Sequence, residues 1–159
     1  MIILGIDPGY ERLGVAVVEK KSRSDKEHLL FSECFKTSAK LTFEDRLSRI
    51  GQEVKKIIKK YKIDTLAIET LFLNTNQKTV MQVAEVRGVI IYEAKNANLK
   101  VFEASPPQIK VATTGYGKAN KEQMMKMVRM LIKIDEETKS DDELDAIAIA
   151  LTAFAYIRF

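Results

Sequence analysis

Two carboxylates follow apolar runs of the sequence directly, in positions from which a side chain could do chemistry. Asp7 comes after the apolar run 1–6 and stands before a Pro-Gly pair. The run predicts a buried strand, which ends there because proline has no N–H to give a sheet and glycine turns sharply. Glu69 closes a second apolar run, 63–69. A carboxylate at the end of a buried strand costs free energy unless it is paired, hydrogen-bonded or bound to a metal ion.

A third source of carboxylates is the acidic segment that begins at Ser140. Asp142 and Asp145 are three residues apart and share one face of the predicted helix. Helical periodicity equally allows the pair Asp141 and Asp145, so spacing alone leaves that choice open. Ser140 and Glu143 form a capping-box pattern, and we interpret Asp141 and Glu143 as residues that stabilise the helix start. Small residues would let this helix lie close against a sheet; they are Ala146, Ala148 and Ala150.

These acids converge in the sheet that the sequence predicts. In the strand order third, second, first, fourth, the first and fourth strands are parallel neighbours, so Asp7 and Glu69 lie side by side. Oxygen ligands without His or Cys point to Mg²⁺ or Mn²⁺. Two such ions about 3.5–4 Å apart are the usual means of hydrolysing a phosphodiester bond. The alternative for each acid taken singly is a turn or capping residue.

The order of the predicted elements indicates an α/β protein. Strands are predicted at 1–7, 13–19, 29–37, 63–69 and 100–103. Helices are predicted from Thr42 onward and at 76–96, 105–113, 121–132 and 140–157. Strands joined by turns, followed by alternating strands and helices, predict a mixed five-stranded sheet with helices on both faces. We expect a single domain over residues 1–159, since no linker or internal repeat interrupts the pattern.

The composition is that of an ordinary globular protein with a basic excess. Apolar residues make up 46% and charged residues 30% of the 159 residues. The net charge of +4 and a pI near 9.1 mildly favour a polyanionic partner. The single cysteine, Cys34, excludes an internal disulfide and a cysteine-based zinc site. No apolar run could span a membrane and Met1 leads directly into a strand, so we expect no signal peptide and a cytoplasmic location.

Six stretches, in order along the chain, resemble the RuvC-type Holliday junction resolvases, nucleases with the ribonuclease H-like fold. They are IDPG at 6–9, AIETLF at 67–72, QVAEVRG at 82–88, PQIK at 107–110, GYGKANK at 115–121 and DELDAIA at 142–148. Each stretch alone is a weak signal, since Asp-x-Gly strand ends occur across the superfamily. The full set with family-like spacing is specific. The resemblance implies a Mg²⁺-dependent endonuclease that cuts two opposing strands of a four-way DNA junction.

The resemblance also assigns roles to individual residues. The family's four metal-binding catalytic positions are matched by Asp7, Glu69, Asp142 and Asp145. Some relatives carry His at the position of Asp142. Basic positions needed for cleavage are matched by Lys110 and Lys121, where we expect them to neutralise charge at the scissile phosphate. We expect Lys118 to contact DNA phosphates. Without the resemblance these lysines would be interpreted as surface residues.

The resemblance and the symmetry of a junction imply partners as well. Phe72 would stack on bases at the junction centre, where each stacked base contributes about 1–3 kcal/mol; the alternative is a buried loop anchor. The helix 76–96 is apolar on more than one face, which suits a homodimer with two equivalent sites, although a monomer could bury such a helix fully. By family resemblance, the branch-migration complex of RuvA and RuvB is a further partner.

Three other functions compete with junction resolution as interpretations of the sequence. A RuvC-like nuclease that processes ribosomal RNA would share the fold, but such nucleases usually lack the stretches seen here at 107–110 and 115–121. A non-catalytic nucleic-acid-binding module would not need four intact acids. An actin-like kinase would need two such domains, and this chain is too short for them.

Overall fold

One mixed sheet of five strands forms the centre of the molecule. The computed structural model describes residues 1–71, 77–134 and 140–157. The strands are β1 (Ile2–Asp7), β2 (Arg12–Glu19), β3 (His28–Lys36), β4 (Thr65–Glu69) and β5 (Lys100–Ala104), in the spatial order β3-β2-β1-β4-β5. The first three are antiparallel neighbours, while β4 runs parallel to both β1 and β5. The predicted strand order is therefore confirmed.

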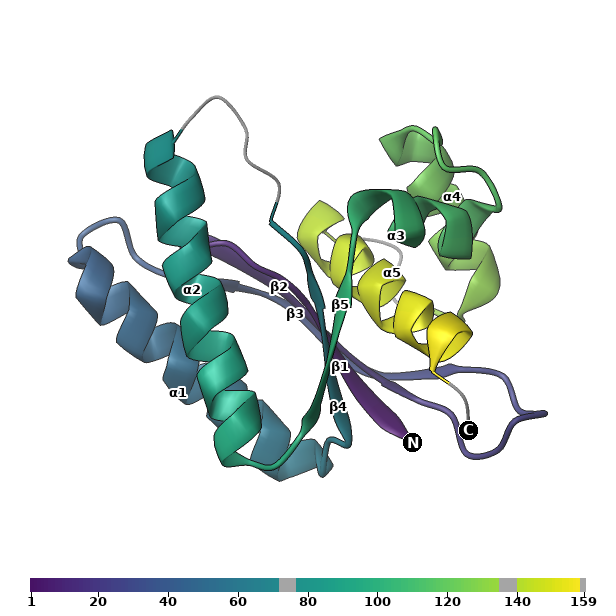
Figure 1. The fold of residues 1–159 in the computed structure, drawn as a ribbon, viewed down its shortest axis with the longest axis horizontal. Helices are drawn as coiled ribbons and strands as arrows, with labels where there is room; N and C mark the ends of the chain where they lie inside the picture. Colours follow the sequence, from purple (N-terminus) through teal and green to yellow (C-terminus); the bar gives the residue numbers. More distant parts are fainter. Residues whose placement is uncertain (72–76, 135–139, 158–159) are drawn as a thin grey trace.

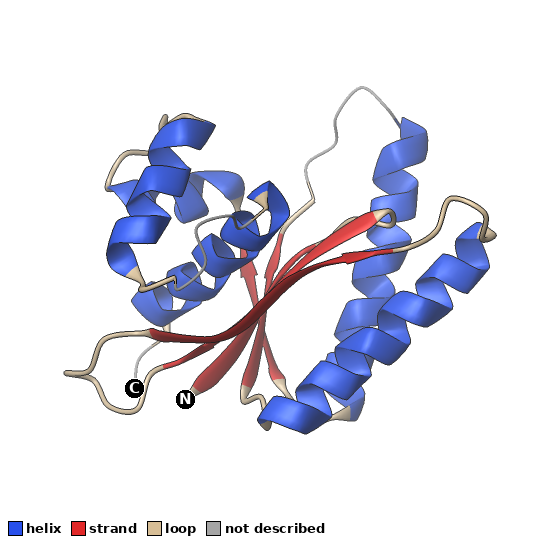
Figure 2. Cartoon of the chain, turned by 180° about the vertical axis from the view of Figure 1, so that it is seen from behind, coloured by secondary structure: helices blue, strands red, loops and turns tan. Residues whose placement is uncertain are grey.

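Helices cover both faces of this sheet, as predicted. They are α1 (Phe43–Tyr61), α2 (Gln77–Asn96), α3 (Pro106–Thr114), α4 (Lys121–Leu131) and α5 (Asp141–Tyr156). Helices α1 and α2 lie on one face, and α3, α4 and α5 lie on the other (Figure 1 and, from behind, Figure 2). Each face has its own buried apolar cluster. Within the described residues, no helix combines the length and the apolar character that crossing a membrane requires.

The helix starts follow from capping residues in the sequence. Thr42 accepts a hydrogen bond from the backbone of Asp45 at 3.3 Å, and Ser140 forms the expected capping box with Glu143. The predicted boundaries mostly agree with the structure to within one residue. The fourth strand is an exception, because it begins at Thr65, two residues later than predicted. There the Asp64 carboxylate, and not a ladder carbonyl, accepts the Ile2 N–H at 2.7 Å.

Helix α5 lies unusually close to the sheet, and glycines make that approach possible. A Cβ atom added to Gly5 on β1 would lie 2.3 Å from the carbonyl oxygen of Ala146. A Cβ atom added to Gly14 on β2 would lie 2.1 Å from the carbonyl oxygen of Asp142. Neither distance is sterically possible, so a side chain at either position would push the helix away. The close packing brings the first turns of α5 to the end of the sheet at which β1 and β4 finish.

Candidate active site

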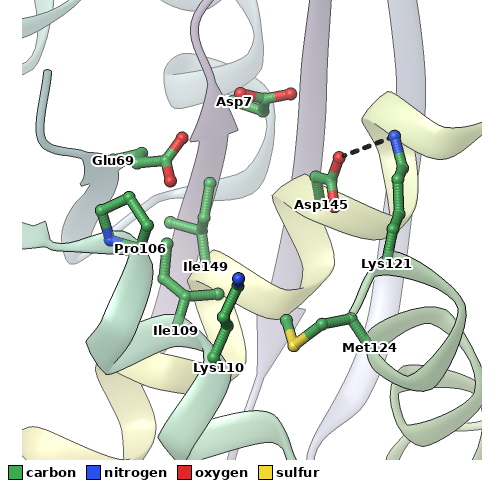
Figure 3. A pocket seen from close by; sticks show the side chains of 9 residues that line it. All are labelled: Asp7, Glu69, Pro106, Ile109, Lys110, Lys121, Met124, Asp145 and Ile149. Atoms are coloured by element: carbon green, nitrogen blue, oxygen red, sulfur yellow. Dashed lines mark ion pairs between the residues drawn. The ribbon is translucent and has the colours of Figure 1, made fainter. Parts of the chain in front are cut away.

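Three of the predicted carboxylates line one pocket at the carboxyl ends of two parallel strands. Asp7 ends β1 and Glu69 ends β4, and the parallel register that pairs Ile6 with Ile68 places the two side by side. Asp145 enters from the second turn of α5. The three side chains surround a cavity of about 230 Å³ (Figure 3). The predicted convergence of the two strand ends with the acidic helix is present.

Two of the predicted lysines line the same cavity. Lys110 lies on α3, which begins with a capping box at Ser105, and Lys121 is the first residue of α4, which is capped by Asn120. The cavity wall is completed by apolar side chains and a proline; these are Pro106, Ile109, Met124 and Ile149. Figure 3 shows Lys121 beside Asp145, and Lys110 near the apolar side chains of Ile109 and Met124.

The negative charges of the pocket oppose one another. Burial first, and then the charges of Asp145 and Glu69, raise the pKa of Asp7 to about 7. Burial and the charge of Asp145 also raise the pKa of Glu69. Burial raises the pKa of Asp145 itself, against the opposing effect of Lys121. A positive charge placed among these carboxylates would relieve the repulsion, which is the electrostatic setting of a cation site.

Lys121 supplies part of that positive charge. Its ammonium nitrogen lies 3.1 Å from a carboxylate oxygen of Asp141 and 3.6 Å from one of Asp145. Desolvation acts against its charged form, but the hydrogen bond with Asp141 and the charge of Asp145 outweigh it and raise the pKa of Lys121. Asp141 therefore has a partner across the helix interface, which its interpretation as a simple capping residue did not include.

Asp142, the fourth predicted acid, does not line the cavity. Its carboxylate forms an ion pair with Arg12 at the start of β2, and the thiol of Cys34 on β3 donates to the same oxygen at 3.4 Å. Sequence reasoning did not find Arg12. The register of the β1–β2 hairpin indicates where Arg12 lies, because it pairs Asp7 with Gly14 and so places Arg12 at the same end of the sheet.

The donor chemistry of the pocket fits a hard divalent cation, although the acids are not gathered around one point. Among residues 1–71, 77–134 and 140–157, no three His, Cys, Asp or Glu side chains are close enough to form a metal-binding group. Asp7, Glu69 and Asp145 nevertheless offer only oxygen atoms, which are the ligands that Mg²⁺ and Mn²⁺ prefer. Burial, followed by repulsion from neighbouring carboxylates, raises the pKa of all three, and a bound cation would oppose that effect. These three residues are the ones that could hold a metal ion.

Of the two remaining predicted site residues, the structure describes only Lys118, which does not line the cavity. Lys118 is exposed in the turn between α3 and α4. Phe72 lies outside the described residues. A second cavity adjoins the first, because Glu69 and Pro106 line both, and it extends between the end of β4 and the start of α2. The candidate site therefore continues from the end of β4 toward the start of α2.

Comparison with known proteins identifies the family. The family described as crossover junction endodeoxyribonuclease RuvC matches residues 3–153. The RuvC protein of Halothermothrix orenii is 41% identical over 151 residues, which cover 95% of this chain and 90% of that protein. The RuvC protein of Caldanaerobacter subterraneus subsp. tengcongensis is 42% identical over the same length and shares of the two chains.

A solved structure agrees with the sequence comparison. Thermus thermophilus RuvC in complex with a Holliday junction substrate superposes with a TM-score of 0.89 at 33% identity, and the match covers 98% of this chain and 94% of the other. The resemblance inferred from the motifs, and with it the ribonuclease H-like fold, is confirmed. This chain belongs to the RuvC family of crossover junction endodeoxyribonucleases.

Proposed function

We propose that this protein is a structure-selective endonuclease that resolves four-way DNA junctions in recombination and repair. The observation that carries the proposal is the single pocket in which three carboxylates face two lysines. This combination suits phosphodiester hydrolysis, because the acids can bind cations and the lysines can neutralise phosphate charge. Membership of the RuvC family and the Thermus thermophilus relative solved with a Holliday junction substrate specify the DNA.

The metal of the proposed enzyme is Mg²⁺, with two ions in each active site, and Mn²⁺ can replace it. Asp7, Glu69 and Asp145 would hold the ions, and Asp142 would join them from the neighbouring turn of α5. Bound cations supply activation of the attacking water and neutralisation of the charge on the leaving oxygen. The chain's own contribution is to fix the carboxylates on two strand ends and one helix.

The lysines act on the substrate side of the pocket. Lys110 and Lys121 line the cavity and would neutralise the charge that develops on the scissile phosphate. Lys121 can do so only if it leaves Asp145, and a cation bound to Asp145 would favour that release. Lys118 would contact a more distant phosphate, which contributes affinity without sequence choice. Phe72 would stack on a base at the junction centre.

Two symmetric cuts call for two active sites, and α2 offers a surface for a homodimer. Three residues on one side of this helix, spaced by seven and four positions, are exposed: Met81, Gly88 and Tyr92. The Met81 and Tyr92 side chains are 65% and 63% exposed, which is high for large apolar or aromatic groups. A two-fold axis through this stripe would bury both in a partner and present two pockets to one junction.

The remaining proposals concern the cellular setting. A junction resolvase acts where chromosomal DNA is handled, which in a bacterial cell is the cytoplasm. The RuvA–RuvB branch-migration complex would bring junctions to the enzyme.

A RuvC-like activity on structured RNA is the competing function, and a non-catalytic nucleic-acid-binding module is a further one.

A comparison of substrates tests the proposal. Wild type and Asp7→Asn are incubated with a synthetic four-way junction, a linear duplex of the same sequence and a structured RNA, with and without Mg²⁺. We expect paired nicks in opposing strands of the junction only, dependent on Mg²⁺ and absent in the variant. Equal cutting of the linear duplex would contradict the proposal. Preferential cutting of RNA would favour the competing nuclease, and no cleavage of any substrate would favour the binding module.

A further inference from the structure

Arg12, Asp142 and Cys34 form a polar cluster beside the candidate active site. The Arg12 guanidinium contacts a carboxylate oxygen of Asp142, and the Cys34 thiol donates to the same oxygen at 3.4 Å. The antiparallel register pairs Gly14 on β2 with Cys34 on β3, so Arg12 and Cys34 reach the first turn of α5 from neighbouring strands. The cluster directs the Asp142 carboxylate toward β2 and β3, away from the cavity that Asp7, Glu69 and Asp145 share.

The backbone of Asp142 packs tightly against β2, so the direction of its carboxylate depends on the side-chain rotamer. The Asp142 carbonyl lies directly above Gly14, close enough that a Cβ atom there would be 2.1 Å away. The capping box of Ser140 and Glu143 holds the same turn, and Ser32 on β3 donates to Glu143 at 2.8 Å. Asp142 also lies three residues before Asp145 on α5, so the two side chains leave the helix on neighbouring positions of one face. Rotation of the Asp142 side chain alone would therefore bring it toward the cavity.

Arg12 has an alternative partner in the proposed substrate. Its side chain is 52% exposed, whereas that of Asp142 is 22% exposed, so the guanidinium can be reached from solvent while still bound to the acid. Guanidinium groups bind phosphate oxygens through paired hydrogen bonds, in the same geometry that they use for carboxylates. A DNA phosphate at this end of the sheet could displace the Asp142 carboxylate from the Arg12 guanidinium.

We propose that Arg12 is a positioning residue that holds Asp142 out of the metal site until a backbone phosphate of the junction takes the guanidinium. Release of Asp142 then adds a fourth carboxylate to the three that already line the cavity. The active site would thus bind its metal most tightly only when DNA is present. This inference rests on the proposed function, since it takes junction DNA as the ligand that releases Arg12.

Metal binding without DNA tests the first half of the proposal. Mn²⁺ is titrated into the metal-free full-length protein, and bound manganese is followed by electron paramagnetic resonance. We expect Arg12→Gln to bind Mn²⁺ about three- to tenfold more tightly than wild type, the gain that loss of a partly exposed ion pair provides. Arg12→Lys keeps the ion pair and stays near wild type. Lys26→Gln, an exposed position in the β2–β3 hairpin at the opposite end of the sheet, is the matched charge control.

A double mutant separates the proposed path from a general charge effect. In the Asp142→Asn background, Arg12→Gln is expected to change Mn²⁺ affinity no more than Lys26→Gln does. An equally large gain in that background would overturn the inference, because Arg12 would then act through space and not through Asp142. Equal Mn²⁺ affinity of Arg12→Gln and Lys26→Gln in the otherwise wild-type protein would overturn it as well.

Junction binding in EDTA tests the second half. We expect Arg12→Gln to weaken binding of a four-way junction and to reduce the dependence of log Kd on log salt by about one phosphate contact. Junction affinity and salt dependence equal to those of Lys26→Gln would overturn the release by DNA. Failure of the proposed function is distinguishable, because the wild type itself would then not cut junctions, whatever the metal affinities of the variants.

Discussion

The folded protein disfavours the negatively charged form of the Asp7 side chain. Burial and the neighbouring carboxylates raise its pKa to about 7 from a usual value of 3.8. Between these two values the folded state binds a proton that the unfolded state has released. The stability of the metal-free protein therefore falls as pH rises from about 4 to about 7, and the loss is complete above the folded pKa.

The first prediction concerns this destabilisation. Asp7→Asn mimics the protonated side chain, so without metal it should be more stable than wild type at pH 8, by about 1–3 kcal/mol, with the difference vanishing near pH 4. Urea unfolding at both pH values measures it. The control is Asp25→Asn in the exposed β2–β3 hairpin, which should change little at either pH. Equal stability of Asp7→Asn and wild type at pH 8 would show that the Asp7 charge is already compensated.

The second prediction separates two lysines that the sequence treats alike. Lys121 lines the cavity and pairs with Asp145, whereas Lys118 is exposed three residues earlier. Lys121→Ala should lower the single-turnover cleavage rate of a junction by about 10²–10³-fold, the usual effect of removing a group that stabilises transition-state charge. Lys118→Ala should leave this rate nearly unchanged and weaken junction binding. Similar effects of both substitutions on the rate would argue against a role for Lys121 at the scissile phosphate.

Residues could be placed from the sequence where strand ends and strand order determine their position, and not where the position depends on side-chain contacts between distant elements. Asp7 and Glu69 were placed correctly because each ends an apolar strand, and the two strands are parallel neighbours. Helical spacing could not decide between Asp141 and Asp142. The ion pair of Arg12 with Asp142 joins residues 130 positions apart, and it depends on how α5 packs over β2, which no local pattern encodes.

At the scale of elements, the packing of α5 against the sheet determines where the site residues lie. The small residues of α5 predicted a close approach, and Ala146 and Ala150 indeed face Gly5 across that contact. The sequence does not show which strand residues make room for the helix, because glycines on strands serve several purposes. The structure identifies Gly5 and Gly14, on adjacent antiparallel strands, as the positions that admit the helix backbone.

The third prediction tests the packing of α5 against β2. Gly14→Ala places a Cβ atom against the Asp142 carbonyl, so α5 must shift, and we expect a loss of about 1–3 kcal/mol in the free energy of unfolding. Junction cleavage should fall as well, because the shift moves Asp145 relative to Asp7. Gly88→Ala, where no atom lies within 4 Å of an added Cβ, is the matched control. Unchanged unfolding and cleavage in Gly14→Ala would mean that α5 tolerates displacement.

At the scale of the whole molecule, the candidate active site and the proposed dimer surface lie on opposite faces of the sheet. Helices α3, α4 and α5 lie on one face of the sheet and α2 lies on the other (Figure 1). The exposed residues of α2 include Met81, Gly88 and Tyr92. The sequence predicted that α2 is apolar on more than one side. Of the apolar residues that carry this pattern, Val86 and Ile90 are buried, and other residues form the exposed stripe. Assembly through this stripe would leave the catalytic face of each copy free for DNA.

The fourth prediction concerns that assembly. Gly88 is open to solvent, so Gly88→Arg should fold normally but place a bulky charge in the proposed two-fold interface. We expect the wild type and Gly88→Ala to be dimers, and Gly88→Arg to be a monomer, when molar mass is measured by light scattering after size-exclusion chromatography. A monomeric wild type would rule out the α2 homodimer. A dimeric Gly88→Arg variant would move the interface elsewhere.

The most direct test of junction resolution uses a supercoiled plasmid that extrudes a cruciform. A resolvase with two coupled sites cuts both opposing strands of the cruciform in one encounter, so linear plasmid should form without accumulation of nicked circles. The reaction should need Mg²⁺, fail with Asp7→Asn and spare a relaxed plasmid of the same sequence. Accumulation of nicked circles, or equal cutting of the relaxed plasmid, would contradict the account of this protein as a paired-strand junction resolvase.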